Sequence, residues 1–515
     1  MFHRILIANR GEIALRVIRS AREMGIETVA VYSDFDKKAL HTRMAHRAVA
    51  LGGNLPSESY LVADKVIAAA KATGAEAIHP GYGFLSENAK FARAVVDAGL
   101  TWIGPPASAI EAMGDKIKSR RAMKAANVPV VPGIVDPVDD AKAAIAEAEK
   151  VGYPIALKAA AGGGGKGIRI VREAAQMESA FRTASGEAKS SFGDGRLYIE
   201  RYLDRPRHIE VQLLFDKHGN GVHYGVRECS IQRRHQKLLE ECPSVVIDDA
   251  TREKMGAVAL AAGRAVGYEN AGTVEFLWTP KPNAKSAKDG DFYFLEMNTR
   301  LQVEHPVTEM VTGVDLVREQ LRVAAGEKLG YQQSAITWRG WAIEVRLNAE
   351  DPFHGFLPST GTIHNLRMPG GPFVRLDLGM YRGMEVGVNY DPMLGKLIVW
   401  GAARDEAIAR MRRALQEMNI GGVRTSAPAA LAVLEDERFQ KGDFDTHFLE
   451  ALDLKRERQD FDALVAAAAA IFRHRQAVRR TLGTDSAARS AWLARSRRGM
   501  SDNVAHGVRR PEASA

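Results

Sequence analysis

The sequence is poor in cysteine: Cys229 and Cys242 are the only two in 515 residues, so a disulfide framework is excluded. It also lacks an uninterrupted apolar run of the roughly 18 residues that suggest a membrane-spanning helix. The apolar stretch at the N-terminus is too short for a signal peptide and has no small-residue cleavage site. With 46% hydrophobic and 26% charged residues, the composition is that of a globular protein of several domains. We therefore expect a cytoplasmic protein with no membrane contact.

The net charge of +8 is unevenly distributed along the chain. Residues 451–515 contain thirteen Lys and Arg against seven Asp and Glu, so the first 450 residues carry a net charge of only about +2. A basic terminal segment is more often a solvated or partner-docking helix than a binding site for a polyanion. We therefore predict no nucleic-acid partner, and salt-sensitive retention of RNA or DNA would be needed to support one.

The glycine pattern of a dinucleotide-binding site is missing as well. The chain begins with an apolar strand at Arg4–Ala8, an amphipathic helix that stops at Gly25, a second strand at Thr28–Tyr32 and, later, a strand at Ala77–His79. This β-α-β order predicts a parallel sheet. The turn at Asn9–Ile13 has one glycine where a dinucleotide site needs three, so a dehydrogenase is disfavoured.

The pattern changes beyond the first hundred residues. Pro105-Pro106 and Pro129–Gly133 suggest a domain boundary near residue 115. The following alternating runs are typical of an antiparallel sheet: Arg207–Leu214, Gly221–Val226, Gly272–Trp278 and Phe292–Met297. Short strands and glycine turns fill residues 341–400, a third, β-rich region. The alanine-rich segment Leu464–Ile471 predicts a helix, and Ser501–Ala515 has the composition of a disordered tail.

Four adjacent glycines between two lysines form a candidate phosphate site. A strand at Pro154–Ala159 leads into Gly162–Gly165, flanked by Lys158 and Lys166, and a second strand follows at Ile168–Val171. Backbone N–H groups without neighbouring Cβ atoms can wrap phosphate oxygens, and the lysines supply charge. Because the loop joins two strands, it is a hairpin and not a Walker site. A flexible surface hairpin is the alternative interpretation.

Two carboxylates and an amide indicate a magnesium site. Glu275 and Glu296 lie on two expected neighbouring strands, and Asn298 lies on the same face as Glu296. Carboxylate and amide oxygens are hard ligands that suit Mg²⁺, which also binds phosphate oxygens. Glu296 stands between apolar residues, where an unpaired charge would be costly. Solvated charges on a strand edge are the alternative.

A polar segment follows directly. Arg300, Gln302 and Glu304 alternate with Leu301 and Val303, so a strand would place the three polar groups on one face. An arginine and an amide can hold a small planar oxyanion, and an adjacent carboxylate can remove its proton. Bicarbonate fits this description.

From Met1 to about Leu449 the chain resembles the biotin carboxylase family of the ATP-grasp superfamily. The matching segments are Ile5–Glu12, His79–Asn88, Met113–Lys118, Lys158–Gly167, Arg233–Lys237, Glu296–Glu309 and Glu344–Asp351. Ligases for short peptides or purine precursors share the ATP-grasp core but lack the Arg-His-Gln-Lys segment and the Glu-Met-Asn-Thr-Arg-Leu-Gln-Val-Glu-His run.

The resemblance implies a multidomain fold of the α/β and α+β classes. A Rossmann-like parallel domain is expected over residues 1–114. An ATP-grasp domain with an antiparallel sheet is expected over 115–330, with a mobile glycine-rich lid over about 132–204. A β-rich biotin carboxylase C-terminal domain would span 331–449, and a helical basic tail 450–515.

The resemblance also implies roles for individual residues. The nucleotide would be bound by Lys116, Lys158, Gly164, Gly165, Glu200, Arg201, Leu203, His208, Gln232, His235, Glu275 and Glu296. The metal ligands would be Glu275, Glu296 and Asn298, and the bicarbonate site Lys237, Arg300, Gln302 and Val303. Glu304 would be the general base and Arg346 would face biotin, so the catalytic group would be Arg300, Glu304, Arg346 and Lys237.

Two positions need comment. Arg201 replaces a lysine that is frequent in the family, and since the contact is largely through the backbone, we expect little consequence. Cys229 lies near Lys237 in sequence and could pair with it in acid–base chemistry, but we interpret Cys229 as a small buried residue.

The implied activity is ATP-dependent carboxylation of carrier-bound biotin by bicarbonate through carboxyphosphate, with Mg²⁺ or, in its place, Mn²⁺. Carriers in this family present biotin on Met-Lys-Met, whereas the only Met-Lys here, Met123-Lys124, lies in an expected helix. We therefore expect the biotin carrier and the carboxyltransferase on other chains, and a homodimer or larger complex. The acceptor would be acetyl-CoA or propionyl-CoA, with a two-subunit pyruvate carboxylase as the alternative.

Two further expectations concern inactivity and the tail. A catalytically inactive scaffold is disfavoured because every charged position that the family needs is present. In the tail, a helix continuing to Arg480 would have one apolar face made of Phe461, Leu464, Ala468, Ile471 and Phe472. Such a face must be buried against the catalytic core or a partner. The similar position of carboxyltransferase-binding regions in longer acyl-CoA carboxylase subunits favours a partner.

Overall fold

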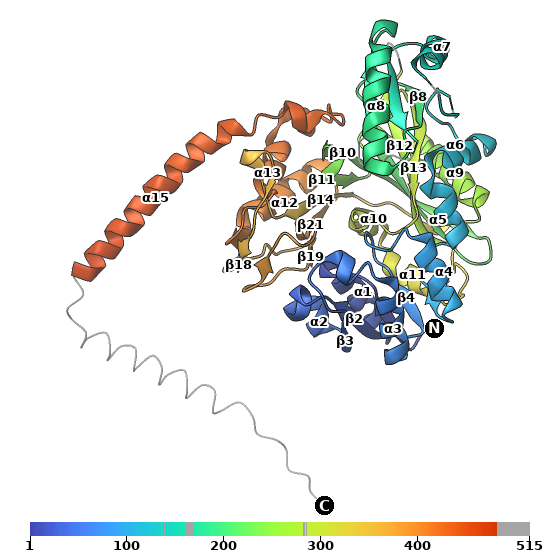
Figure 1. The fold of residues 1–515 in the computed structure, drawn as a ribbon. Helices are drawn as coiled ribbons and strands as arrows, with labels where there is room; N and C mark the ends of the chain where they lie inside the picture. The colour runs from blue at the N-terminus through green and yellow to red at the C-terminus, as the bar shows by residue number, and fades with distance from the viewer. Residues whose placement is uncertain (135, 139, 161–167, 282–283, 285, 482–515) are drawn as a thin grey trace, which may run out of the picture. The chain divides into compact units, whose positions relative to one another are not determined.

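Five parallel strands form the first sheet of the computed structural model, which describes residues 1–134, 136–138, 140–160, 168–281, 284 and 286–481 (Figure 1). The sheet order is β3-β2-β1-β4-β5, and every neighbouring pair is parallel, as the β-α-β pattern predicts. The strands are β1 (Arg4–Ile7), β2 (Glu27–Tyr32), β3 (Arg47–Ala50), β4 (Ala77–His79) and β5 (Thr101–Trp102). The helices of this region are α1 (Gly11–Glu23), α2 (Leu40–Met44), α3 (Ala63–Thr73), α4 (Ala89–Asp97) and α5 (Ala107–Gly114).

An eight-stranded antiparallel sheet forms the middle of the molecule, in the order β13-β12-β9-β10-β11-β14-β21-β19. The strands expected in the ATP-grasp region are present as β9 (Arg207–Phe215), β10 (Gly221–Arg233), β11 (Gln236–Cys242), β12 (Asn270–Pro280) and β13 (Gly290–Asn298). The β-rich C-terminal region extends the same sheet through β14 (Trp341–Asn348), β19 (Val374–Leu378) and β21 (Met393–Gly401). Side chains from distant segments of the chain are therefore held at fixed positions by the hydrogen bonds of a single sheet.

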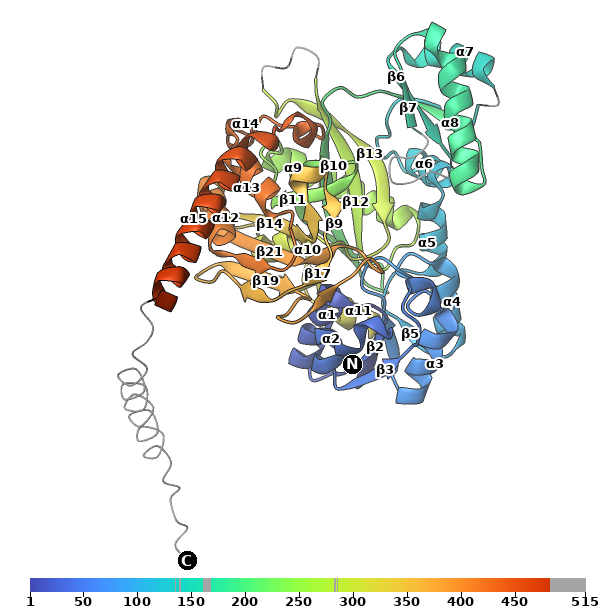
Figure 2. The ribbon, with the colours of Figure 1, turned by 60° about the vertical axis from the view of Figure 1, so that its left-hand side comes forward.

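A smaller sheet with the order β7-β6-β8 carries α7 and α8 and lies apart from the main sheet (Figure 2). Its elements are β6 (Ile155–Ala159), β7 (Ile168–Val171), β8 (Leu197–Arg201), α7 (Ala141–Val151) and α8 (Met177–Phe192). β6 and β7 pair antiparallel, so the predicted hairpin is confirmed. The glycine loop between them, with Gly164 and Gly165, lies outside the described residues.

Helices cover the main sheet and join it to the N-terminal region. α9 packs against β9 and β10, α12 against β14 and β21, and α1 contacts α11, β19 and β21. The remaining helices are α6 (Lys116–Ala125), α9 (Asp249–Ala265), α10 (His305–Thr312), α11 (Leu316–Ala324), α12 (Arg404–Glu417), α13 (Ala427–Glu435) and α14 (Glu437–Lys441). The short strands are β15 (Glu350–Asp351), β16 (Leu357–Pro358), β17 (Gly361–Thr362), β18 (Asn365–Arg367), β20 (Glu385–Val386) and β22 (Asn419–Gly421).

The segment Arg300–Glu304 is not the strand that its alternating pattern predicts. β13 ends at Asn298, the chain then turns, and α10 begins at His305 with Glu304 as its N-cap residue. Pro306 explains the difference, because its fixed φ and missing N–H favour the first turn of a helix over a strand. The polar side chains of this loop still converge, but they do so through a turn and not through strand periodicity.

Residues 453–515 form a unit separate from Met1–Leu452. Its helix α15 (Lys455–Thr481) confirms the helix expected in the tail, and Met123-Lys124 lies in α6 as expected. Among the side chains of α15 that the structure describes, the exposed ones include the large apolar residues Leu464, Val465, Ile471, Phe472 and Val478. The expected disordered end at Ser501–Ala515 lies outside the described residues. In the part of the chain that the structure describes, no helix is long and apolar enough to cross a membrane.

Candidate active site

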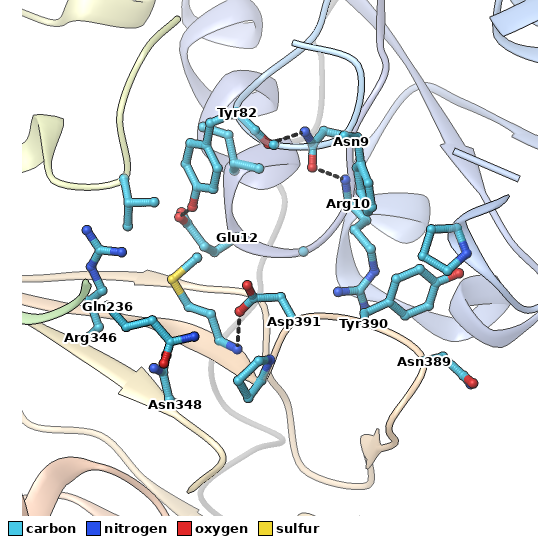
Figure 3. Close-up of a pocket in the computed structure, with 18 of the residues that line it drawn as sticks. Asn9, Arg10, Glu12, Tyr82, Gln236, Arg346, Asn348, Asn389, Tyr390 and Asp391 are labelled. Atoms are coloured by element: carbon cyan, nitrogen blue, oxygen red, sulfur yellow. Dashed lines mark hydrogen bonds between the residues drawn. The ribbon is translucent and has the colours of Figure 1, made fainter. Parts of the chain in front are cut away.

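A cavity of about 540 Å³ lies where the loop before α10, the main sheet and the N-terminal region meet (Figure 3). Four of the residues predicted for bicarbonate and biotin line it: Lys237, Arg300, Val303 and Arg346. Its other walls come from the start of α1, the turn after β4 and the loop before β21, and include Asn9, Arg10, Gly11, Glu12, Ile13, Tyr82, Gly83, Phe84 and Val388–Met393. Residues that are far apart in the sequence, from Asn9 to Met393, thus enclose one space.

Lys237, near the start of β11, is the central cation of the site. Its Nζ donates to Glu304 Oε1 at 2.6 Å and to Glu275 Oε1 at 3.3 Å, and it also donates to Glu210. Burial alone would lower the pKa of Lys237, but the carboxylates of Glu210, Glu275 and Glu304 raise it well above its usual value. Lys237 is therefore a permanent positive charge among three acids.

Glu304 is held from two sides. Lys237 binds Oε1, while Arg346 Nη2 donates to Oε2 at 2.9 Å and Arg346 Nε donates to Glu240 at 2.6 Å. Burial and the nearby Glu210 would raise the pKa of Glu304, but the charges of Lys237, Arg346 and Arg227 hold it below its usual range. The carboxylate is therefore ionised near neutral pH and able to accept a proton.

The other polar residues of the predicted bicarbonate site, Gln302 and Arg300, lie around the Lys237–Glu304 pair. Gln302 accepts from Arg227 Nη2 at 2.8 Å through Oε1, and its Nε2 donates to Glu275 Oε1 at 2.8 Å. Arg300 donates to Glu87 Oε2 at 2.9 Å and to Asn298 Oδ1 at 3.1 Å. These hydrogen-bonded side chains are held in fixed orientations, as the recognition of a small planar anion requires.

A second cavity, of about 330 Å³, lies at the junction of α6, β6, β8 and β13. The predicted nucleotide residues Lys116, Lys158, Glu200 and Glu296 line it, together with Asn298. Lys158 donates to Glu200, which also pairs with Arg120. Burial lowers the pKa of Lys116, although the carboxylates of Glu296, Glu200 and Glu275 oppose that shift. The lysines expected to contact phosphates therefore share a cavity with two of the three expected metal ligands, Glu296 and Asn298.

The carboxylates predicted to bind a metal are cross-strand neighbours. Glu275 on β12 is directly opposite Glu296 on β13, and Asn298 Nδ2 donates to Glu275 Oε1 at 2.8 Å. Burial and the negative charge of Glu275 raise the pKa of Glu296. Two carboxylates that are held this close repel each other, and a cation that binds between them lowers that repulsion. The pair therefore fits Mg²⁺.

A further acidic cluster lies next to this pair. The ligand atoms of His208, Glu210 and Glu275 lie within 4.8 Å of one another, but Lys237 already neutralises the two acids. His208 Nε2 is 2.9 Å from Glu275 Oε2. Burial alone would lower the pKa of His208, but Glu275 raises it, to about 9. His208 is thus a cation beside Glu275 in this arrangement.

Several predicted nucleotide residues lie away from both cavities as the described residues define them. Arg201 is exposed at the end of β8, Leu203 follows it, and His235 is in the turn between β10 and β11. Gln232 is buried on β10, opposite Lys237. These positions, like the others assigned to the nucleotide, stay predictions for a nucleotide contact.

Sequence reasoning missed several residues that hold the site together. Glu210 binds Lys237 and Arg227, Glu240 binds Arg346, and Glu87 binds Arg300. A signal for Glu210 was present, because His208, Glu210 and Gln212 alternate with apolar residues along β9, and all three are buried. Three polar residues on one buried strand face indicate a polar site inside a sheet. Glu87 and Glu240 gave no such local signal.

Cys229 has no part in this network as an acid or base. The side chain is fully buried, which confirms its interpretation as a buried residue, and both cysteines are free thiols. Burial and the charge of Glu210 raise the pKa of Cys229 well above its usual value. The thiol is therefore protonated and a poor proton acceptor.

Three family models match the chain. They are "Biotin carboxylase, N-terminal domain" over residues 1–110, "Carbamoyl-phosphate synthase L chain, ATP binding domain" over 115–332 and "Biotin carboxylase C-terminal domain" over 344–451. Their order, with the site just described, defines an ATP-grasp ligase. The chain belongs to the biotin carboxylase family, as the sequence motifs predict.

Relatives with different names resemble the chain to a similar degree. A pyruvate carboxylase subunit of Methanothermobacter thermautotrophicus is 53% identical over 450 residues, 87% of this chain and 90% of that one. The propionyl-CoA carboxylase alpha chain of Ruegeria pomeroyi is 49% identical over 509 residues, 93% of this chain and 73% of that one. The crystal structure of the biotin carboxylase domain dimer of Hydrogenobacter thermophilus 2-oxoglutarate carboxylase, in complex with MgADP, ADP and bicarbonate, has a TM-score of 0.82 at 47% identity. That match covers 87% of this chain and 97% of the solved chain.

Proposed function

We propose that this chain carboxylates biotin carried by a separate protein, using bicarbonate and ATP, in the first half-reaction of an acetyl-CoA or propionyl-CoA carboxylase. Biotin carboxylase activity follows from the family. The observation that carries the proposal for the site is Glu304, an ionised carboxylate held between Lys237 and Arg346 at the edge of a cavity. A base that lies between two cations can accept a proton from an anionic substrate, because the cations attract that anion.

The first step uses Glu304 as the base. Bicarbonate held by Lys237, Arg300 and Gln302 gives its proton to the Glu304 carboxylate. A carbonate oxygen then attacks the γ-phosphorus of ATP, the bond to the ADP oxygen breaks, and carboxyphosphate forms. Lys116 and Lys158 would stabilise the negative charge on the phosphate oxygens. Support for their role comes from the cavity that they share with Glu296.

The metal site would consist of Glu275, Glu296 and Asn298. The raised pKa of Glu296 and the register of the two acids support this assignment. When bound, Mg²⁺ would neutralise charge on the phosphates of ATP. The chain's own contribution is to hold the two carboxylates at fixed positions, with Asn298 and Gln302 each donating to Glu275.

The second step transfers carbon dioxide to biotin. Carboxyphosphate breaks into CO₂ and phosphate, the phosphate takes the proton from the ureido nitrogen, and that nitrogen attacks CO₂. Arg346 would stabilise the negative charge that develops on the ureido oxygen. Its guanidinium is held by Glu240 and Glu304 and lines the cavity, which supports this role (Figure 3). The unit of β6, β7 and β8 would act as the lid that keeps water from carboxyphosphate.

The partners proposed for the chain are a biotin carrier, a carboxyltransferase and a second copy of the chain. The related 2-oxoglutarate carboxylase domain is described as a dimer, which supports a homodimer. The exposed apolar side chains of α15, such as Leu464 and Phe472, support a partner for this helix, and we assign it to the carboxyltransferase. The match to the propionyl-CoA carboxylase alpha chain covers 93% of this chain, a share that must reach beyond residue 451.

Pyruvate is a second candidate for the final acceptor, because the relative at 53% identity is named for it. The site described here binds biotin and not the acceptor, so the acceptor is decided by the carboxyltransferase. Purification of the native complex, followed by identification of its carboxyltransferase, would distinguish the candidates. A carboxyltransferase that binds CoA thioesters would support our proposal, and one that carboxylates pyruvate or another 2-oxo acid would contradict it.

The proposed half-reaction is tested with the purified chain. We expect release of phosphate from ATP that requires Mg²⁺, bicarbonate and free biotin together. Glu304→Gln should abolish this turnover while leaving ATP binding in place, because the substitution removes the base with little change in volume. Turnover by Glu304→Gln equal to that of the wild type would contradict the assigned base.

A further inference from the structure

Lys396 on β21 is a fully buried lysine that no proposed step uses. Its Nζ donates to the carbonyl oxygen of Val303 at 2.6 Å and lies 3.2 Å from Glu12 Oε1. Val303 immediately precedes Glu304, and Glu12 lies in the first turn of α1. One ammonium group therefore joins the main sheet, the N-terminal region and the loop that carries the proposed base.

The charge on Lys396 is maintained despite its burial. Burial alone would lower the pKa of Lys396, but Glu12, Glu344 and Asp377 raise it above its usual value. Placing an ammonium group out of water is costly unless it is paired and hydrogen-bonded. A neutral side chain of similar length would fill the space without that cost, so packing alone does not explain a lysine here.

The register of the main sheet gives the lysine a specific relation to the active site. Lys396 is directly opposite Arg346 in the β14–β21 pair, and opposite residues in a sheet project on the same face. Arg346 donates to the carboxylate of Glu304, whereas Lys396 donates to the carbonyl of the peptide bond that begins Glu304. Two neighbouring cations thus hold the same residue at its two ends.

The loop needs such support because the sheet does not supply it. Residues 299–304 follow the end of β13 and precede α10, so strand hydrogen bonds do not fix their backbone.

The contact between the main sheet and α1 is also tight. A Cβ atom on Gly379, just after β19, would lie 2.9 Å from the backbone nitrogen of Glu12, so the N-terminal helix is packed directly against this part of the sheet.

Glu12 completes the arrangement on the side of the cavity. Tyr82 donates its hydroxyl to Glu12 Oε1, the same oxygen that lies nearest to Lys396 (Figure 3). Both Tyr82 and Glu12 line the large cavity. The connection therefore runs from the cavity wall through Glu12 and Lys396 to the Val303–Glu304 peptide.

We propose that Lys396 is a positioning residue for bicarbonate activation: its ammonium fixes the Val303–Glu304 peptide plane, and so aims the Glu304 carboxylate at the substrate. The inference rests on the proposed function of Glu304. Lys396 itself touches neither bicarbonate nor biotin in this role. Its effect is on geometry, and displacement of a catalytic group by about 1 Å can cost roughly 10²-fold in rate.

The test compares Lys396→Met with a matched control, Arg404→Met. Arg404 is also a largely buried cation that pairs with a buried carboxylate, Glu241, and donates to two backbone carbonyls, those of Phe439 and Gln440. None of these partners lies in residues 299–304. We expect Lys396→Met to lower kcat/KM for bicarbonate roughly 10²-fold, with an unchanged Kd for ATP measured by calorimetry. Arg404→Met should lose thermal stability to a comparable degree and keep the wild-type kcat/KM for bicarbonate.

Equal kinetic losses in both variants would show a merely structural lysine and overturn the proposal, as would wild-type kinetics in folded Lys396→Met. If circular dichroism shows that Lys396→Met is unfolded, Lys396→Gln is used, because its side chain stays polar beside the buried carboxylates but is too short to reach the Val303 carbonyl. Its kcat/KM for bicarbonate should be reduced with ATP binding intact, and a wild-type value would again overturn the proposal. An inactive wild-type enzyme would instead refute the proposed function.

Discussion

Replacing Arg346 with alanine tests the proposed biotin site most directly. The guanidinium donates to Glu240 Oε1 at 2.6 Å and to Glu304 Oε2 at 2.9 Å, and it lines the cavity. Loss of a preorganised partner for a developing oxyanion costs roughly 10²–10³-fold in rate, or about 3–4 kcal/mol. We therefore expect Arg346→Ala to lose biotin carboxylation on that scale while its Kd for ATP is unchanged.

The same substitution should change the pH dependence of the reaction. Glu304 has a lowered pKa in part because of the charge of Arg346. Without that charge the pKa of Glu304 rises, so the base is protonated at a higher pH. The acid limb of the profile of kcat/KM for bicarbonate against pH should therefore move to higher pH.

Arg404→Ala provides the control for stability. Arg404 makes a two-point contact with Glu241, 2.7 Å from Oε2 and 3.1 Å from Oε1, and is buried to a similar degree as Arg346. Removing one partner of a buried ion pair costs about 3–5 kcal/mol, so both variants should melt at lower temperature. An unchanged carboxylation rate in Arg346→Ala, or an equal loss in Arg404→Ala, would refute the role of Arg346.

Three further predictions concern the metal, acid stability and the tail. Glu296→Gln should reduce Mg²⁺-dependent turnover far more than thermal stability, because it removes a ligand charge with little change in volume. His41 is buried with a pKa lowered to about 4, mainly by burial. It therefore stabilises the fold above its unfolded pKa of about 6.5 and loses this as pH falls toward 4, by up to about 3 kcal/mol. Truncation after Leu454 should leave carboxylation of free biotin intact and impair assembly with the carboxyltransferase.

Each of these has a contrary outcome. Normal MgATP turnover with reduced stability in Glu296→Gln would make that residue structural. The His41 prediction is measured by chemical denaturation of the wild type and of His41→Gln at pH 7 and pH 4.5. A loss of stability between the two pH values that is equal in the two proteins would contradict the role of His41. For the third, co-purification measures assembly; loss of the half-reaction with normal assembly would show that α15 supports the catalytic core.

The sequence predicted features that depend on local pattern. The strand alternation placed Glu275 and Glu296 on neighbouring strands, and the structure confirms that they are directly opposite. The same reasoning was wrong for Arg300–Glu304, because period 2 was assigned without weighing Pro306 as the start of a helix. A local pattern can pair consecutive strands but cannot show which strands from distant parts of the chain become neighbours, so the addition of β14, β19 and β21 to the main sheet was not foreseen.

Long-range ion pairs were the part of the site that sequence could not reveal. Glu240 pairs with Arg346, which is 106 positions away in the sequence, and Glu87 pairs with Arg300, which is 213 positions away. Each pairing is decided by sheet register or by packing between regions, and a single carboxylate gives no sign of its eventual partner. Lys396 was missed for the same reason, since its partners Glu12 and Val303 lie in other parts of the fold.

The continuous main sheet fixes the relative positions of the residues proposed for the two substrates. Glu275 on β12 and Arg346 on β14 are separated in this sheet by β9, β10 and β11, and Lys237 on β11 links them by binding both Glu275 and Glu304, the partner of Arg346. A hydrogen-bonded sheet does not lengthen or shorten, so the phosphate end and the biotin end keep a constant separation. Sequence change can then remodel loops, lids and the tail, and so the choice of partner protein, without moving Glu275 and Arg346 relative to each other.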